Sequence, residues 1–253
     1  MFLVAEKMAA SLGWAFWSIF LYLICSIGYI IIDILSYVSV ISNSTLYILY
    51  IIFASILVSE AALYTIDWAQ YVFCQSKSTS IWNYKLKFFA SIFHIIGSIV
   101  YLLAGIFGNT TVQNQSNLLT TPQLFVYNII ATAALLIEAI LTHICWMIHP
   151  PDIKKVCHCT CGVALWAHLL NIVGGLVYLV SSILPLILTA ATSLSSTTIY
   201  LNYVRPVQIA GDGCYLIDSM LYIILWIMEW NHRKKAYNDE PIEPEPRGPM
   251  FLR

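Results

Sequence analysis

The chain has 253 residues and a net charge of −1, and 60% of its residues are hydrophobic but only 10% are charged. An ordinary soluble domain has about 25% charged residues. A near-neutral chain without a basic patch lacks the features of nucleic-acid binding, so nucleic acid is excluded as a partner. Because apolar runs of 20 residues or more recur throughout, we expect an integral membrane protein that contacts the lipid bilayer.

The hydropathy pattern predicts an all-α, polytopic membrane protein with six transmembrane helices. A hydrocarbon core of about 30 Å needs roughly 20 helical residues, and every predicted helix is at least that long. Residues 1–13 should precede the first span as a short N-terminal segment, and the Pro- and Glu-rich residues 231–253 should form a disordered tail. The predicted transmembrane domain is 14–230, with helices at about 14–36, 46–70, 86–107, 124–148, 163–188 and 205–230.

The basic residues predict the orientation in the membrane. Segments 39–45, 108–123 and 189–204 contain no Lys or Arg, whereas the segments on the opposite side carry several. Because basic residues accumulate in cytoplasmic segments, the N- and C-termini are both expected in the cytoplasm. The basic residues on that side are Lys77, Lys85, Lys87, Lys154, Lys155, Arg233, Lys234 and Lys235.

Three glycosylation sequons fall in the predicted outer segments. They begin at Asn43, Asn109 and Asn114, on the side where a glycan acceptor must lie. This pattern favours a eukaryotic protein inserted through the secretory pathway, in the plasma membrane or in an endolysosomal membrane.

Cysteines gather at the opposite, cytoplasmic boundary. Thiols next to a membrane helix are candidates for palmitoylation, although unmodified thiols are also compatible with the pattern. A metal site is disfavoured because Cys-x-Cys spacing is tighter than the usual gap between zinc ligands, so no metal is predicted. The palmitoylation candidates are Cys74, Cys157, Cys159 and Cys161.

The same two-helix unit occurs three times, at about 14–73, 86–149 and 163–230, which predicts three hairpins with pseudo-threefold symmetry. The second helix of each unit carries an acid, a Tyr or Thr four residues later and a Trp eight residues later, all on one helical face. An acid inside the hydrocarbon core costs roughly 2.5–3.5 kcal/mol, so three matched acids need an explanation. The triplets are Glu60, Tyr64, Trp68; Glu138, Thr142, Trp146; and Asp218, Tyr222, Trp226.

The first helix of each unit also has a repeated pattern, in which two small residues precede a tyrosine. The small residues allow a neighbouring helix to approach closely. Seven residues before each tyrosine stands a polar residue, and these three residues lie at nearly the same membrane depth as the repeated acids. We expect an intramembrane polar layer in which each hairpin forms one pair: Tyr22 with Glu60, His94 with Glu138, and Asn171 with Asp218.

Two interpretations of the polar layer are open. In the first, the acids are protonated by burial and hold the helices together through hydrogen bonds. The protein would then be a non-enzymatic accessory, sorting or sensory component that acts through helix packing and its cytoplasmic tail, with a membrane-protein partner or as a homo-oligomer. In the second, the acids line a path for a cation or a proton, and the protein is a transporter or channel. Solvent access to the acids distinguishes the two.

Other chemistry has weaker support. His143 and His168 both lie near the inner membrane face, which makes a haem-binding redox protein a third possibility, but His94 has no matched partner for a second haem. No phosphate loop, nucleophile elbow or dinucleotide fingerprint occurs. We therefore expect no enzyme activity and no cofactor.

The segment Phe88–Glu138 resembles the small two-helix YrhK-type membrane domain. The resemblance rests on the sequence from Ile96 to Tyr101, Ile-Gly-Ser-Ile-Val-Tyr, followed by an acid-bearing second helix. It implies a helical hairpin without a known activity, and it transfers no functional residues. Mitochondrial carriers also have three two-helix repeats, but their Pro-x-Asp/Glu-x-x-Lys/Arg signature is missing from the first, third and fifth helices.

Overall fold

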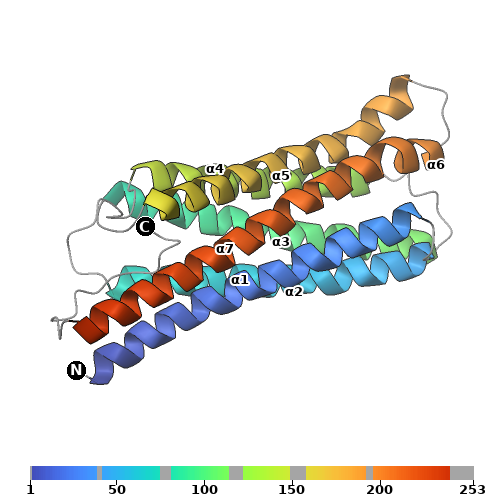
Figure 1. Ribbon diagram of the computed structural model, residues 1–253. Coiled ribbons are helices and arrows are strands. Elements are labelled where there is room, and N and C mark those ends of the chain that lie inside the picture. The colour runs from blue at the N-terminus through green and yellow to red at the C-terminus, as the bar shows by residue number, and fades with distance from the viewer. Residues whose placement is uncertain are drawn as a thin grey trace.

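The computed structural model describes residues 2–38, 42–74, 81–113, 122–148, 158–191 and 196–239. Every regular element in these ranges is helical, and six helices are long and apolar enough to cross a membrane. The prediction of an all-α polytopic membrane protein is therefore confirmed. The long helices, labelled in Figure 1, are α1 (Phe2–Tyr37), α2 (Asn43–Cys74), α3 (Ile81–Gln113), α4 (Pro122–Ile148), α5 (His158–Ala191) and α7 (Arg205–Asp239).

Several helices extend beyond the predicted spans. Helix α1 begins at Phe2, ahead of the predicted first span, which starts at about residue 14. Helix α7 continues to Asp239, so residues 231–239 of the expected tail are helical. The remainder of that tail, 240–253, lies outside the described residues. Membrane helices can project past the hydrocarbon core, and a hydropathy window detects only the apolar part.

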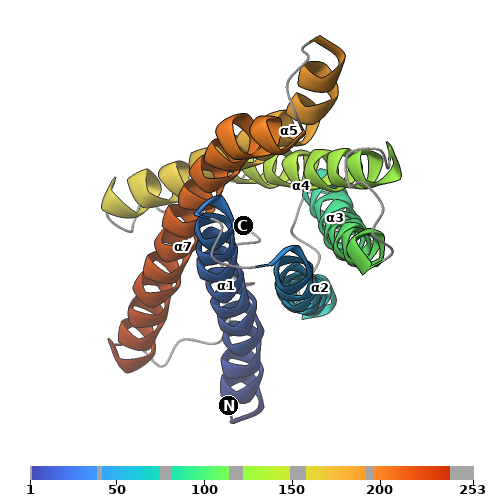
Figure 2. The same cartoon turned by 90° about the vertical axis from the view of Figure 1, so that its right-hand side faces the viewer.

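The six long helices form a closed ring in chain order. Each helix packs against the next one along the chain, and α7 packs against α1 to complete the ring. Figure 2 shows this succession from one end of the bundle. The first turns of α1 and the last turns of α7 lie at the same end (Figure 1). The expected hairpins correspond to α1–α2, α3–α4 and α5–α7, whereas their pseudo-threefold symmetry and the cytoplasmic location of the termini stay predictions.

Polarity is distributed in the opposite sense to that of a soluble protein. The outward helix faces expose large apolar side chains such as Trp17, Phe89 and Leu176, whereas most of the acidic residues in the described ranges are buried between the helices. A soluble protein buries its apolar side chains and exposes its acids. An apolar exterior around a polar interior suits a surrounding lipid bilayer.

Glycines let neighbouring helices approach at two of the matched small positions. A Cβ atom on Gly97 of α3 would lie 2.7 Å from the Leu135 side chain and 3.2 Å from the carbonyl oxygen of Ala131. A Cβ atom on Gly175 of α5 would lie 3.4 Å from the Cα of Leu136. The expected close packing is therefore confirmed at these positions, where α4 contacts the helices on both sides of it.

The sixth span begins with an irregular segment that positions a buried arginine. The short α6 (Ser196–Ile199) leads into a π-helical turn, η3 (Tyr200–Val204), and the N–H of Arg205 donates to the carbonyl of Tyr200. Pro206 follows and has no N–H to donate. Single π-helical turns often occur at functional sites, and here the turn delivers Arg205 to the interior, where only 7% of its surface is exposed.

The close packing at Gly97 gives a stability prediction. Gly97→Ala should lower the melting temperature of the purified protein, because overpacking a tight contact costs typically about 1–3 kcal/mol. Gly213→Ala in α7 is the matched control, because a Cβ there would meet no atom within 4 Å. The control should leave the melting temperature unchanged or raise it, since Ala favours a helix over Gly by about 1 kcal/mol. Equal effects of the two substitutions would contradict the packing argument.

Candidate functional site: a polar cavity inside the helix ring

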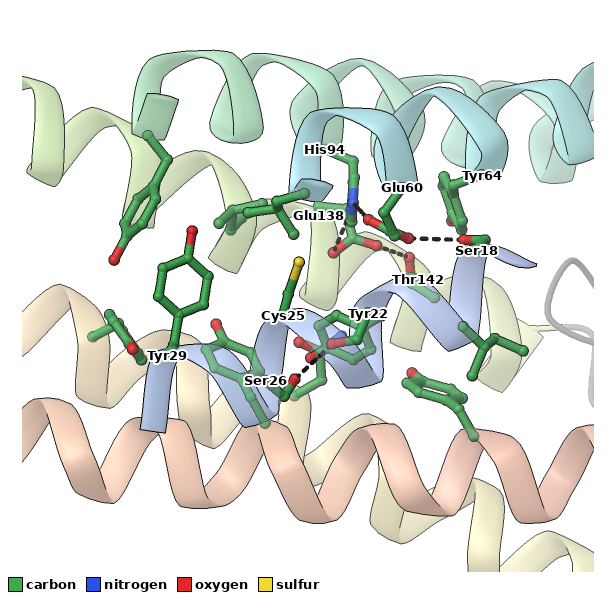
Figure 3. A pocket seen from close by; sticks show the side chains of 18 of the residues that line it. Ser18, Tyr22, Cys25, Ser26, Tyr29, Glu60, Tyr64, His94, Glu138 and Thr142 are labelled. Atoms are coloured by element: carbon green, nitrogen blue, oxygen red, sulfur yellow. Dashed lines mark hydrogen bonds and ion pairs between the residues drawn. The ribbon is translucent and has the colours of Figure 1, made fainter. Parts of the chain in front are cut away.

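The ring encloses a cavity of about 140 Å³ to which all six long helices contribute side chains. Its lining is rich in tyrosine and includes carboxylates, hydroxyls and histidines. Figure 3 shows that these side chains extend from helices on opposite sides of the ring toward a shared interior. The cavity has three parts: a central acidic layer, a network around Arg205, and the region around His168.

A histidine joins two glutamates in the central layer. The Nε2 atom of His94 on α3 lies 2.5 Å from Oε2 of Glu60 on α2, and its Nδ1 atom lies 3.6 Å from Oε2 of Glu138 on α4. All three side chains line the cavity (Figure 3), and each residue is at most 9% exposed. The imidazole therefore connects three consecutive helices.

Hydroxyl groups complete the contacts of the two glutamates. Ser18 on α1 donates to Oε1 of Glu60 at 2.8 Å, and Thr142 donates to Oε1 of Glu138 at 2.9 Å. The Tyr64 ring stacks on the imidazole of His94 with 5.2 Å between the ring centroids. An aromatic face favours a cation above it, so this stacking suits a protonated imidazole.

The third repeated acid has a different environment. Asp218 on α7 is fully buried and does not line the cavity. Tyr22 on α1, which does line it, donates to Oδ2 of Asp218 at 3.0 Å. Oδ1 of Asp218 has no hydrogen-bond partner in the described part of the chain. The repeated acids are thus equivalent in sequence but not in access to the cavity.

The polar residues pair differently from the sequence-based expectation. Tyr22 bonds to Asp218 instead of Glu60, and Asn171 bonds to Tyr222, one turn beyond Asp218. His94 does contact Glu138, but its shorter contact is with Glu60 in the preceding hairpin. The reason is geometric, because the second helix of each hairpin (α2, α4 or α7) lies between the first helices of two hairpins. Glu60 and Asp218 both turn toward the first helix of the next hairpin around the ring.

A second charged network links α7, α1 and α2. The Nη1 atom of Arg205 donates to Asp33 at 2.8 Å, to the Tyr50 hydroxyl at 2.5 Å and to Gln208 at 2.8 Å. Tyr50 also donates to Asp33. The sequence repeat does not indicate this pair. A signal for it is that Arg205 is the only arginine within the six spans and that Asp33 lies at the same end of the bundle.

One further acid belongs to this network. Asp212 on α7 interacts electrostatically with Asp33 and Arg205, and it accepts a hydrogen bond from Tyr178 on α5. The network therefore contains two carboxyl groups and one guanidinium. Asp212 and Tyr178 both line the cavity, so this network forms one end of it.

His143 and His168, the two histidines considered for a haem, lie in a cluster of aromatic rings. The rings of His143 and His168 are 5.8 Å apart, and Trp146 packs against both at 5.9 and 5.5 Å. The hydroxyl of Tyr222 lies 3.2 Å from Nδ1 of His168. In the described ranges no group of three or more His, Cys, Asp or Glu side chains is arranged to hold a metal ion.

The modification candidates lie at or beyond the ends of helices. Asn43 is the first residue of α2, and Asn109 lies in the final turns of α3 with its side-chain oxygen buried. Cys74 ends α2, and Cys159 and Cys161 fall in the first turn of α5. Asn114 and Cys157 lie outside the described residues. Glycosylation and palmitoylation stay predictions.

The charge balance determines what the cavity can do chemically. The central layer holds three carboxyl groups and one imidazole, and the Arg205 network holds two carboxyl groups and one guanidinium. Ionised groups buried without a partner are very costly. The excess carboxyl groups must therefore carry protons or face a bound cation.

No known protein family, characterised protein or solved structure matches this chain. The resemblance of one hairpin to YrhK-type domains therefore contributes nothing to the function.

The central layer gives a coupling prediction. His94→Leu should lower stability strongly, since removing one partner of a buried ion pair costs about 3–5 kcal/mol. His94→Leu/Glu60→Gln should be less destabilised than the sum of the single variants, because the glutamine removes the Glu60 charge that His94→Leu alone leaves buried without its imidazole. Melting temperatures of all four proteins in one detergent test this, and additive effects would show that the two residues act independently.

The Arg205 network gives a second coupling prediction. Arg205→Met leaves the Asp33 carboxyl buried without its cation and should reduce the melting temperature, whereas Arg205→Met/Asp33→Asn should recover part of the loss. Arg205→Lys should also be destabilising, because an ammonium is more strongly hydrated than a guanidinium and is therefore more costly to bury beside Asp33. Full stability of the lysine variant would mean that only the charge matters.

Proposed function

We propose that the protein is a proton- or cation-coupled transporter whose path runs through the cavity. The observation that carries the proposal is that Glu60 and Glu138 both line the cavity and are joined there by His94. Acids that serve only to hold helices together can be buried in close contacts, and they need no shared space. Intramembrane ionisable residues are typical of ion pathways and proton relays.

Polar groups continue from the central layer toward both ends of the cavity. Asp67 and His168 line it on one side of the layer, and Asp212 lines it on the other. Such a series offers successive positions for a proton or a small cation. Because the lining holds more carboxylates than bases, it favours positive over negative cargo.

The second candidate is a non-enzymatic accessory, sorting or sensory component in which the acids have a structural role. The specific observation in its favour is that both oxygens of Glu60 already have hydrogen-bond partners, Ser18 and His94. For both candidates we propose a protein without enzyme activity. We also propose a secretory-pathway membrane as its location, because the sequons and the basic segments fall on opposite sides of the predicted spans. Access of water to the acids separates the candidates.

Flux measurements test the transporter. In proteoliposomes with an imposed inside-negative K⁺ diffusion potential, the wild-type protein should acidify the lumen, and Na⁺ and K⁺ uptake should be measured in parallel. Glu60→Gln/Glu138→Gln/Asp218→Asn should abolish the flux, because no carboxylate in the central layer would remain to exchange a positive charge. Glu229→Gln is the control, since Glu229 lies on α7 but does not line the cavity.

Folding and access are measured on the same proteins. Each variant should elute as a single symmetric peak, and a hydrophobic carbodiimide should label Glu60 and Glu138 in the wild type, as peptide mass spectrometry would show. Absence of both flux and labelling in a well-folded wild-type protein would overturn the transporter and support the structural role. Equal flux in the wild type and the triple variant would place the path outside the central layer.

A further inference from the structure

The repeated tyrosines of the odd helices all line the cavity. Tyr29, Tyr101 and Tyr178 follow the small residues in the three matched motifs, and Tyr22 and Tyr215 lie beside them. The ring centroids of Tyr29 and Tyr101 are 5.7 Å apart, those of Tyr178 and Tyr215 are 5.6 Å apart, and those of Tyr22 and Tyr215 are 6.3 Å apart. Four helices thus contribute to one aromatic lining, which the charge path does not itself require.

The hydroxyl of Tyr29 is a buried polar group of this lining. Tyr29 is 8% exposed, and its hydroxyl makes no hydrogen bond in the described part of the chain. The Tyr29 side chain extends from α1 across the interior in Figure 3. Buried polar groups in proteins are nearly always hydrogen-bonded, so this hydroxyl is available to a group inside the cavity. The hydroxyl groups of Tyr22 and Tyr178, by contrast, are bonded to Asp218 and Asp212.

The charges around the aromatic lining favour a cationic ligand. Glu60, Glu138 and Asp212 contribute three carboxyl groups to the cavity, and His94 contributes one imidazole between the two glutamates. Arg205 is not part of the lining and is held by Asp33. Small inorganic cations such as Ca²⁺ and Mg²⁺ prefer a shell of oxygen ligands. Aromatic faces combined with nearby carboxylates instead suit alkylated ammonium ions, which bind to the faces of aromatic rings.

The size of the cavity limits the ligand. A dry cavity of about 150 Å³ in another protein accepts benzene, so about 140 Å³ is enough for a molecule of similar bulk. Tetramethylammonium and the trimethylammonium group of choline are of similar size. A nucleotide, a peptide or a lipid with its acyl chains would not fit.

We propose that the cavity binds a small organic ammonium ion, with the tyrosine rings around its alkyl groups and the carboxylates of Glu60, Glu138 and Asp212 as its counter-charges. This proposal rests on the proposed function, since it names the class of cation that the transporter carries. It assigns the repeated tyrosines a role in recognition and gives the Tyr29 hydroxyl a polar partner in the ligand.

The test compares choline with its uncharged isostere. Binding of radiolabelled choline to the purified full-length protein in nanodiscs should be saturable and should be displaced by tetramethylammonium. The neutral 3,3-dimethyl-1-butanol, in which carbon replaces the ammonium nitrogen, should not displace it at the same concentration. Tyr101→Leu should weaken choline binding at least tenfold, whereas Tyr101→Phe, which keeps the ring, should weaken it less than threefold.

Controls separate recognition from folding and from the transport proposal. Tyr203→Leu changes a tyrosine on the exposed outer face and should leave choline binding unchanged. Equal displacement by the neutral isostere, or equal binding by Tyr101→Leu in a protein of unchanged melting temperature, would overturn the ammonium site. If the wild type carries a proton flux that the triple variant loses, but binds no choline, the ammonium site is overturned and the proposed transporter remains supported. Choline binding without flux of protons or choline would support the site and overturn transport.

Discussion

The burial of carboxyl groups inside a ring of apolar-faced helices is the constraint on which the structure depends. Each acid needs a hydrogen bond, a cation or a proton, because a bare charge in this environment is very costly. His94 meets the need for Glu60 and Glu138 and thereby fixes α2, α3 and α4 relative to one another. Arg205 meets it for Asp33 and fixes α7 against α1. The polar contacts that neutralise the interior thus also hold neighbouring helices of the ring in place.

The repeated acids show how one duplicated pattern supports different local chemistry. Glu60 and Glu138 open on the cavity and share an imidazole, whereas Asp218 is shielded behind Tyr22. The difference follows from the residue at the matched position of the odd helices, which is Tyr22, His94 or Asn171. A tyrosine donates one hydrogen bond, but a histidine offers two ring nitrogens and can carry a charge. The central layer is therefore polarised toward one side of the ring.

Hydropathy and helical periodicity predict six spans, the neighbouring hairpins and the face on which each acid lies. They do not predict which partner an acid selects. Counting residues gives the depth of Glu60 in the membrane, but Tyr22 and His94 share that depth on the two helices beside α2. Only the rotation of the helix about its axis decides between them. Counting residues also places Asp33 and Arg205 at the same end of the bundle. Their pair has no counterpart in the other two hairpins, so the repeated pattern does not indicate it.

The closure of the ring between its first and last helices has a consequence for biosynthesis. Asp33 and Arg205 are 172 residues apart in the chain, so α1 is made and inserted long before its partner exists. Until α7 arrives, the Asp33 carboxyl lacks its guanidinium and the polar face of α1 lacks one of its two neighbours. The interior between the helices therefore cannot be complete until the last helix has been inserted, and both the Asp33–Arg205 and the Tyr22–Asp218 contacts form only at that point.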